Sequence, residues 1–366
     1  MSAGSRAARL AALATEAELD AVFVGDLVRP GDSGPDAIAN VRWLTGFAGS
    51  SGFAIVGADR REFFTDFRYT ERARSEVSDE FERTTLEGRL VAELAKRFEG
   101  RMGFDEDSTS VASFRKLEEA MPEGATLIPA TGLVEKLRRT KDAREIEAIA
   151  EASRLADEVF EWLASRGLKG RTEREVARSA EAQMRQRGSE PSFGAIVAGG
   201  PNGARPHAEP GDREIGGGEL VVIDMGARVD GYCSDGTRTW ATGEVPEDAR
   251  ETYELVRRAQ QLSLEAISAG VSGAEADRVS RDPITQAGRG DLYGHGLGHG
   301  VGLEVHEAPR LGKTSEDVLQ AGDVVTVEPG VYVPENFGVR IEDLVVVEAS
   351  GVRNLSSTTK DLRNTG

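Results

Sequence analysis

The stretch VVIDMGARVDGYCSDGTRTW, residues 221–240, decides how the second half of this chain folds. An apolar run ends at Asp224, and the dipeptide Asp-Gly at 230–231 separates it from a second strand-like run. Asp-Gly between alternating apolar residues is the strongest short-range signal for a two-residue hairpin turn. If this turn forms, the hairpin pairs Asp224 with Thr237.

Two carboxylates then share one face of the hairpin. Side chains alternate along a strand, so Asp224, Asp235 and Thr237 point the same way, with Asp235 opposite Gly226. The two acids would sit diagonally, roughly 7–8 Å apart at the backbone. Such neighbours repel one another unless a cation lies between them. Two solvated surface aspartates are the alternative, and a one-residue bulge would break the alternation.

Further strands and helices surround this hairpin. Strand-like runs occupy residues 193–200, 323–333 and 338–348. Apolar residues at helical spacing predict helices over 173–188 and 247–270. This half of the chain is therefore expected to be α+β with a mainly antiparallel sheet.

The first half alternates strands with helices, which is typical of an α/β domain. We expect strands at 20–25, 51–57 and 61–70, and helices at 70–82 and 110–121. A long helical pattern over 132–167, with a break near Thr140-Lys141, joins the halves. We therefore predict an N-terminal domain over 1–133 and a second domain over 134–366, with a connecting helix near 134–140.

The composition excludes several classes of protein. The chain has 63 acidic and 45 basic residues and a formal net charge of -18, which argues against a nucleic-acid partner. No apolar run approaches the roughly 18 residues that cross a bilayer, and residues 1–20 indicate an amphipathic helix rather than a signal peptide. A single cysteine, Cys233, rules out an intrachain disulfide and favours a reducing, cytoplasmic location.

The histidines are few and clustered. The chain has four, and three of them fall in HGLGHGVGLEVHEAP, residues 295–309. The interleaved glycines make a helix unfavourable, so His295 and His299 do not form a helical zinc pair, and the HExxH signature is absent. A metal site, an acid/base cluster and a glycine-rich loop that merely holds imidazoles all remain open at this point.

Two more acids stand out further along the chain. Glu328 directly follows the apolar run VVTV, where a buried carboxylate is costly without a partner. Arg340 and Glu342 are two residues apart on another expected strand, so they point the same way. An ordinary Arg–Glu pair beside a hairpin is the alternative explanation for these two.

Taken in order, these segments resemble the pita-bread metallopeptidases, a group that includes methionine aminopeptidase, aminopeptidase P, prolidase and the metal-free creatinase. The likeness rests on the two aspartates of the hairpin and on the segments GHGVGLEVHE, VEPGVY and GVRIED. VRWLTGFAGSSGFAIV and FFTDFRYTERA are similar to the N-terminal domain of aminopeptidase P and small prolidases. The resemblance implies an α+β fold: a C-terminal pita-bread domain and a smaller N-terminal α/β creatinase-like domain.

The resemblance also implies a metal site with two divalent ions. Mn²⁺ is the first expectation, with Co²⁺, Zn²⁺ and Fe²⁺ as alternatives that oxygen-rich ligation also suits. Four carboxylates balance the charge of two such ions. The ligand positions carry over as Asp224, Asp235, His299, Glu328 and Glu342.

Catalytic roles follow from the same likeness. The metals would lower the pKa of a bound water, which becomes the nucleophile. Glu328 would shuttle its proton to the leaving nitrogen, and His306 would stabilise the oxyanion. His207, in the segment GPNGARPHA, and His295 would orient the substrate. Arg340 would hold the carboxylates in register, with Thr237 behind them.

The implied activity is hydrolysis of Xaa-Pro bonds in proline-containing peptides. LTGFAGSSG and TDFRY favour an Xaa-Pro aminopeptidase. The alternative is an Xaa-Pro dipeptidase (prolidase), whose pocket closes behind a free proline carboxylate and to which the loop 26–39 could contribute. A non-catalytic peptide-binding homologue is a third reading, against which the complete ligand set argues. We expect a homodimer.

Overall fold

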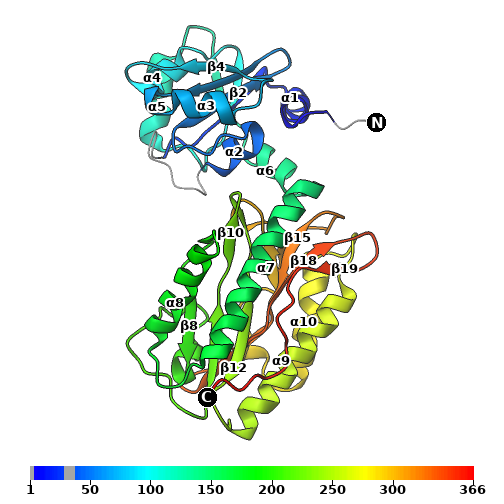
Figure 1. Ribbon diagram of the computed structural model, residues 1–366. Coiled ribbons are helices and arrows are strands. Elements are labelled where there is room, and N and C mark those ends of the chain that lie inside the picture. Colours follow the sequence, from blue (N-terminus) through cyan, green and yellow to red (C-terminus); the bar gives the residue numbers. More distant parts are fainter. Residues whose placement is uncertain (1–3, 29–37) are drawn as a thin grey trace. The chain divides into compact units, whose positions relative to one another are not determined.

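A computed structural model describes residues 4–28 and 38–366 (Figure 1). The chain divides into two compact units, the first ending at Arg138 and the second beginning at Arg139. Most of the loop 26–39, which could contribute to a dipeptidase pocket, lies outside the described residues. The border after residue 133 stays a prediction, and helix α6 (Leu133–Arg138) lies in the first unit.

The first unit is built on one mixed sheet in the order β4-β3-β2-β1-β5-β6. Its central strands pair antiparallel, and the outer pairings are parallel. The strands are β1 (Ala21–Val24), β2 (Gly52–Gly57), β3 (Arg61–Thr65), β4 (Glu82–Thr85), β5 (Arg101–Phe104) and β6 (Thr126–Pro129). The helices before α6 are α1 (Arg6–Glu16), α2 (Ala39–Thr45), the 3₁₀ turn η1 (Phe67–Tyr69), α3 (Thr70–Glu76), α4 (Leu90–Ala95) and α5 (Val111–Ala120).

An aromatic core holds this sheet. The rings of Phe23 and Phe53 stack with centroids 6.0 Å apart, and Phe98 packs on Phe23 at 5.5 Å. All three side chains are buried, and together with Leu27 and Met102 they form one apolar cluster. Burial of large aromatic side chains is the main stabilising contribution in such a small unit.

The second unit repeats one plan, in which two helices precede a group of antiparallel strands. Figure 1 shows its long helices running along the strands. The helices are α7 (Ala143–Arg166), α8 (Glu173–Gln186), α9 (Glu247–Ala266) and α10 (Gly273–Gln286), with 3₁₀ turns η2 (Gly200–Ala204) and η3 (Gly290–Leu292). Asp142 and Glu145 form a capping box that starts α7, and so the chain breaks where the sequence predicted.

Strands of the second unit form two principal sheets, ordered β12-β9-β8 and β14-β13-β15-β18-β19, and every ladder in them is antiparallel. The strands that follow α8 are β7 (Glu190–Pro191), β8 (Ile196–Gly199), β9 (Leu220–Asp224), β10 (Ala227–Val229), β11 (Tyr232–Cys233) and β12 (Thr237–Ala241). The strands that follow α10 are β13 (Gly298–Gly300), β14 (Glu307–Leu311), β15 (Val324–Val327), β16 (Gly330–Val333), β17 (Phe337–Arg340), β18 (Asp343–Val347) and β19 (Val352–Asn354). The predicted α+β character with antiparallel sheet is confirmed.

The hairpin register is also confirmed. Asp224 lies opposite Thr237, and Arg228 lies opposite Cys233, so no bulge interrupts the alternation between them. Asp230 and Gly231 make the turn with φ of 47° and 81°, values that suit a two-residue hairpin loop. The two aspartates therefore emerge on one face.

Several element ends differ from the sequence expectations. The strand expected over 61–70 ends at Thr65, and η1 begins at Phe67. The helix expected over 70–82 ends at Glu76, and the helix expected over 247–270 ends at Ala266. Helix α10 was not expected, because it begins at a glycine and contains Pro283. Among the described residues, no helix is long and apolar enough to traverse a bilayer.

Candidate active site

Three acids converge where the strands of the second unit end. Asp224 closes β9, Asp235 lies between β11 and β12, and Glu342 lies between β17 and β18. One carboxylate oxygen from each lies within 4.8 Å of the others. The hairpin register places the two aspartates, and Glu342 reaches them because its backbone N–H donates to the carbonyl of Thr237 at 3.1 Å.

Burial and mutual repulsion disfavour the ionised forms of these neighbouring acids. Burial raises the pKa of Asp235 and of Glu342 well above the ordinary range, and nearby carboxylates raise both further. Burial likewise raises the pKa of Glu328 to about 7. Since like charges in a dry site disfavour ionisation, the cluster needs positive charge to be fully ionised at neutral pH.

Two oxygens of the cluster have no partner in the described part of the chain. Asp224 Oδ2 accepts a hydrogen bond from Arg340 Nη2 at 2.7 Å, and Glu342 Oε2 accepts one from Thr237 Oγ1 at 2.6 Å. The other oxygen of each carboxylate is buried and unpaired. Each acid is thus anchored by one oxygen and presents the other to the cluster, which suits an oxygen-seeking divalent cation.

His299 presents a nitrogen lone pair to the same place. Its Nδ1 lies 3.0 Å from the carbonyl oxygen of Gly300, which can only accept, so Nδ1 carries the proton. Its Nε2 lies 3.4 Å from Glu328 Oε1 and 3.8 Å from Asp235 Oδ2. Burial lowers the pKa of His299 to about 3. The ring is neutral at physiological pH, and a backbone carbonyl fixes the tautomer that a metal ligand requires.

His295 is engaged differently. Arg340 Nη1 donates to Tyr332 Oη at 2.8 Å, and Tyr332 Oη lies 2.9 Å from His295 Nε2. His295 Nδ1 lies 2.8 Å from the carbonyl of Gly296. Both ring nitrogens are therefore used within the protein, and burial lowers the pKa of His295 to about 4. This histidine also lines the cavity beside the acids.

One cavity of about 350 Å³ gathers every site residue that the sequence predicted. Its wall includes His207 and His306, which are exposed, and the rings of His306 and His299 lie 4.3 Å apart between centroids. The volume suits a small substrate. The full set of predicted residues in this wall is His207, Asp224, Asp235, His295, His299, His306, Glu328, Arg340 and Glu342.

Three further residues were missed by the sequence analysis. Tyr332 joins Arg340 to His295, and Thr326 Oγ1 donates to Glu328 Oε1 at 3.1 Å while accepting from the N–H of His299. Arg310 is an exposed cation in the cavity wall. Hydroxyls have no sequence signal of their own, but Arg310 could have been recognised as a charged residue that follows His306 closely.

Comparisons with known proteins agree with this geometry. The model of metallopeptidase family M24 matches residues 147–349, and the creatinase/prolidase N-terminal domain matches residues 6–140. An Xaa-Pro dipeptidase of Pyrococcus furiosus is 37% identical over 288 residues, 78% of this chain and 77% of that protein.

Two solved structures extend the likeness over nearly the whole chain. An Xaa-Pro dipeptidase from Bacillus anthracis superposes with a TM-score of 0.91 at 38% identity, covering 98% of both chains. An X-Pro aminopeptidase from Thermotoga maritima gives 0.86 at 32% identity, covering 94% of this chain and 97% of that one. The predicted family and fold class are confirmed: the chain belongs to metallopeptidase family M24, whose metallopeptidases use divalent metal ions, and carries a creatinase/prolidase N-terminal domain.

Proposed function

We propose that this protein is a metal-dependent Xaa-Pro dipeptidase. The observation that carries the proposal is the cluster of buried carboxylates with unpaired oxygens, facing the neutral His299 inside a small cavity. Such an arrangement can be fully ionised at neutral pH only when cations occupy it. Several relatives that resemble the chain over most of its length are Xaa-Pro dipeptidases by name.

The residues that would hold two divalent ions are Asp224, Asp235, His299, Glu328 and Glu342. When bound, such ions supply Lewis acidity and an activated water. Oxygen-rich ligation with a single imidazole suits Mn²⁺ best among the alternatives, with Co²⁺, Fe²⁺ and Zn²⁺ also compatible. Four carboxylates neutralise two such ions, so the loaded site carries no excess charge.

Glu328 is proposed to carry the proton of the reaction. Thr326 orients its carboxylate in the cavity wall, where it can accept a proton from the attacking water and release it to the leaving nitrogen. The proline nitrogen is a secondary amine and must be protonated as the peptide bond breaks. A carboxyl group that takes a proton early and returns it late meets that need.

The remaining side chains position the substrate. His306 and His207 are exposed at the cavity, where they can donate to the scissile carbonyl and to the peptide. Arg340 holds Asp224 and Tyr332, and through Tyr332 it fixes His295. We therefore assign His295 to shaping the wall and Arg340 to keeping the carboxylates in register.

Proline explains why a dedicated site is useful. It has no N–H and its φ is fixed, so a protease that binds its substrate as a β-strand loses a hydrogen bond and clashes with the ring. A metal-centred site that grips the scissile carbonyl and the substrate's ends does not depend on that hydrogen bond.

Arg310 favours a dipeptide over a longer peptide. A dipeptide ends in a carboxylate directly after proline, and an exposed guanidinium in the cavity wall is a natural partner for it. The cavity volume of about 350 Å³ is consistent with a substrate of that size. An Xaa-Pro aminopeptidase is the second candidate, favoured by the likeness to the Thermotoga maritima enzyme.

A chain-length series decides between the two. Mn²⁺-loaded protein should cleave Ala-Pro with a kcat/KM at least tenfold above that for Ala-Pro-Ala, with Ala-Ala as the control for proline specificity. A preference for the tripeptide would instead establish the aminopeptidase. Folded, metal-loaded protein that cleaves neither peptide contradicts the proposal.

We also propose a homodimer in a reducing, cytoplasmic setting. Two-fold dimers are the commonest assembly of soluble oligomers, and a chain with one cysteine cannot form an intrachain disulfide. Sedimentation velocity of the metal-loaded protein tests the dimer directly.

A further inference from the structure

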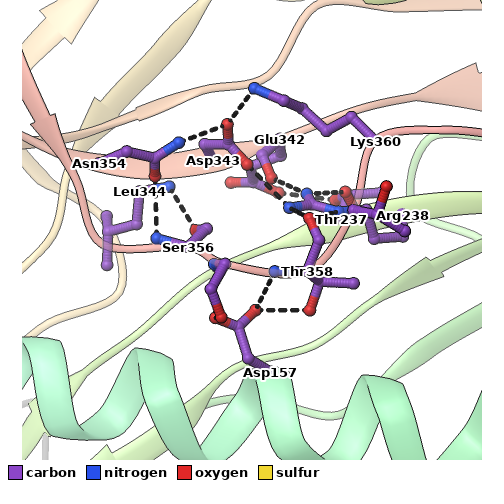
Figure 2. Close-up of polar contacts among 12 residues, drawn as sticks. Asp157, Thr237, Arg238, Glu342, Asp343, Leu344, Asn354, Ser356, Thr358 and Lys360 are labelled. Carbon is purple, nitrogen blue, oxygen red and sulfur yellow. Dashed lines mark hydrogen bonds and ion pairs between the residues drawn. The ribbon is translucent and has the colours of Figure 1, made fainter.

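Behind Glu342 lies a second buried carboxylate, Asp343, whose oxygens are fully paired. Asp343 is 0% exposed and begins strand β18. Figure 2 shows it surrounded by donors from separate parts of the chain. The donors labelled there are Arg238 Nη2 at 2.8 Å, Lys360 Nζ at 2.6 Å and Asn354 Nδ2 at 2.8 Å. Gln260 Nε2 is a fourth donor, at 3.0 Å.

Arg238 connects Asp343 to the candidate metal site. It directly follows Thr237, whose hydroxyl binds the carboxylate of Glu342. Its Nη1 donates to the backbone carbonyls of Glu342 and of Thr237, the latter at 2.9 Å. Glu342 is thus held at its side chain by Thr237 and at its main chain by Arg238 (Figure 2).

These contacts cross a junction between two sheets. Thr237 and Arg238 belong to β12 of the sheet β12-β9-β8, whereas Asp343 belongs to β18 of the five-stranded sheet. No ladder joins the two sheets in the part of the chain that the structure describes. The distance between Glu342 and the aspartates of the hairpin therefore depends on this junction and on the polar contacts that close it.

The C-terminal segment 356–360 closes the junction from behind. The carbonyl of Thr358 accepts from Arg238 Nε at 3.1 Å and from Nη2 at 2.7 Å. The carboxylate of Asp157 on α7 holds Thr358 in turn. It accepts from the Thr358 hydroxyl at 2.7 Å and from the Thr358 N–H at 3.3 Å. Lys360 Nζ also donates to Gln260 Oε1 at 3.0 Å. The segment bridges α7, α9 and both sheets.

We propose that Arg238 and Lys360, bridged by Asp343, are positioning residues for Glu342, so that the C-terminal segment 356–360 forms part of the support of the metal site. Two cations and one anion leave this buried group with one net positive charge beside the anionic cluster. Removing Lys360 leaves Asp343 with a single cationic partner and removes one of the contacts that hold the segment carrying Thr358, the acceptor for Arg238. Glu342 then loses the fixed main-chain position from which it reaches the hairpin aspartates.

Lys360 offers the cleanest test because its side chain is 24% exposed, so replacement does not open the core. Lys360→Arg retains the charge. Arg363→Met is the matched control, because Arg363 lies on the same C-terminal stretch but pairs with Glu161 at the surface, away from Asp343. The experiment titrates metal-free protein with Co²⁺, read by its visible absorption, and measures Ala-Pro hydrolysis in parallel.

Lys360→Met should weaken Co²⁺ affinity about 10-fold to 100-fold, as loss of outer-shell partners does elsewhere, and lower kcat more than it changes KM. Lys360→Arg should restore most of the affinity, and Arg363→Met should match the unmodified protein. Unchanged Co²⁺ affinity and kcat in folded Lys360→Met, with only a lower melting temperature, overturns the inference. If that variant folds poorly, Lys360→Gln keeps a donor without the charge, and wild-type affinity in it overturns the inference equally.

The inference rests on the proposed metallopeptidase function, but the two can fail separately. Unmodified protein that binds Co²⁺ and cleaves no Xaa-Pro peptide refutes the proposed substrate, and the Co²⁺ titration of the Lys360 variants still decides the inference.

Discussion

Glu342 and Asp343 are consecutive acids in the chain, and both are almost completely buried, at 1% and 0% exposure. Glu342 faces other carboxylates, keeps one oxygen unpaired and has a pKa raised by burial. Burial alone would also raise the pKa of Asp343, but Arg238 and Lys360 hold it below its ordinary value. Two adjacent residues point to opposite sides of the backbone and meet opposite electrostatic environments.

The difference separates an acid that supports the fold from an acid that awaits a ligand. A buried carboxylate with four donors is satisfied by the protein itself. A buried carboxylate with a free oxygen beside other acids is destabilising until a cation arrives. By this criterion Asp224 belongs with Glu342, since it also has one anchored and one unpaired oxygen.

The largest expected effect is the loss of catalysis when an acid of the unpaired kind is removed. Glu342→Gln should lower kcat/KM for Ala-Pro by about 1,000-fold or more, since metal ions supply several kcal/mol of transition-state stabilisation. Steady-state kinetics with measured metal content checks this. Near-normal turnover in the folded variant would remove Glu342 from the site.

The two neighbouring acids should also respond oppositely when stability is measured in a chelator. Asp343→Asn should lower the free energy of unfolding by about 3–5 kcal/mol, because it breaks a buried ion pair and leaves Arg238 uncompensated. Glu342→Gln should instead raise the free energy of unfolding of metal-free protein, because it removes a carboxyl group whose charge the neighbouring acids repel. Urea unfolding of both variants in EDTA gives the comparison; shifts of the same sign contradict it.

Glu328 should make the metal-free protein less stable as the pH rises. Its folded pKa of about 7 exceeds the ordinary 4.5, so its contribution to stability is complete below pH 4.5 and is lost as pH rises through 7. His295 and His299, with pKa values of about 4 and 3, act the opposite way below pH 6.5. The contributions overlap in unmodified protein, so a variant is needed to separate them.

Glu328→Gln isolates the carboxylate. In EDTA, its melting temperature relative to unmodified protein should increase steadily between pH 4.5 and 7.5, as the unmodified carboxyl becomes ionised. Thermal unfolding monitored by circular dichroism across that range provides the measurement. A constant difference between the two proteins would show that Glu328 does not titrate there.

A smaller effect is expected from the cations of the site. Arg340 is buried and committed to Asp224, Tyr332 and Thr237, whereas Arg310 is exposed in the cavity wall. Arg310→Met should raise KM for Ala-Pro about tenfold, the value of one charge-assisted hydrogen bond, and leave Ala-Pro-Ala nearly unaffected. An equal rise for both peptides would refute the role proposed for Arg310.

Much of this site was predictable because its signals are local. The hairpin register followed from one Asp-Gly turn, which fixed the shared face of Asp224 and Asp235. Glu328 was recognisable because an acid directly after the buried strand sequence VVTV requires a partner. The resemblance to known metallopeptidases then singled out His299 among three histidines, which spacing alone did not.

The rest depends on contacts between distant parts of the chain. Tyr332 reaches His295 across 37 residues, and Arg238 reaches Asp343 across 105, so neither contact has a pattern in the sequence. Helix α10 was missed because Gly273 and Pro283 disfavour helices locally, and the packing of α10 against α9 outweighs that preference. The tertiary structure decides such features.

The central claim is that the unpaired carboxylates hold divalent metal, and metal stoichiometry tests it most directly. Mn²⁺ binding to chelator-treated protein, followed by isothermal titration calorimetry, should show about two ions per chain, as four carboxylates require by charge balance. The doubly substituted Asp235→Asn, Glu342→Gln protein should lose tight binding while remaining folded. Saturable binding in that variant equal to the unmodified protein, or none in the unmodified protein, contradicts the account.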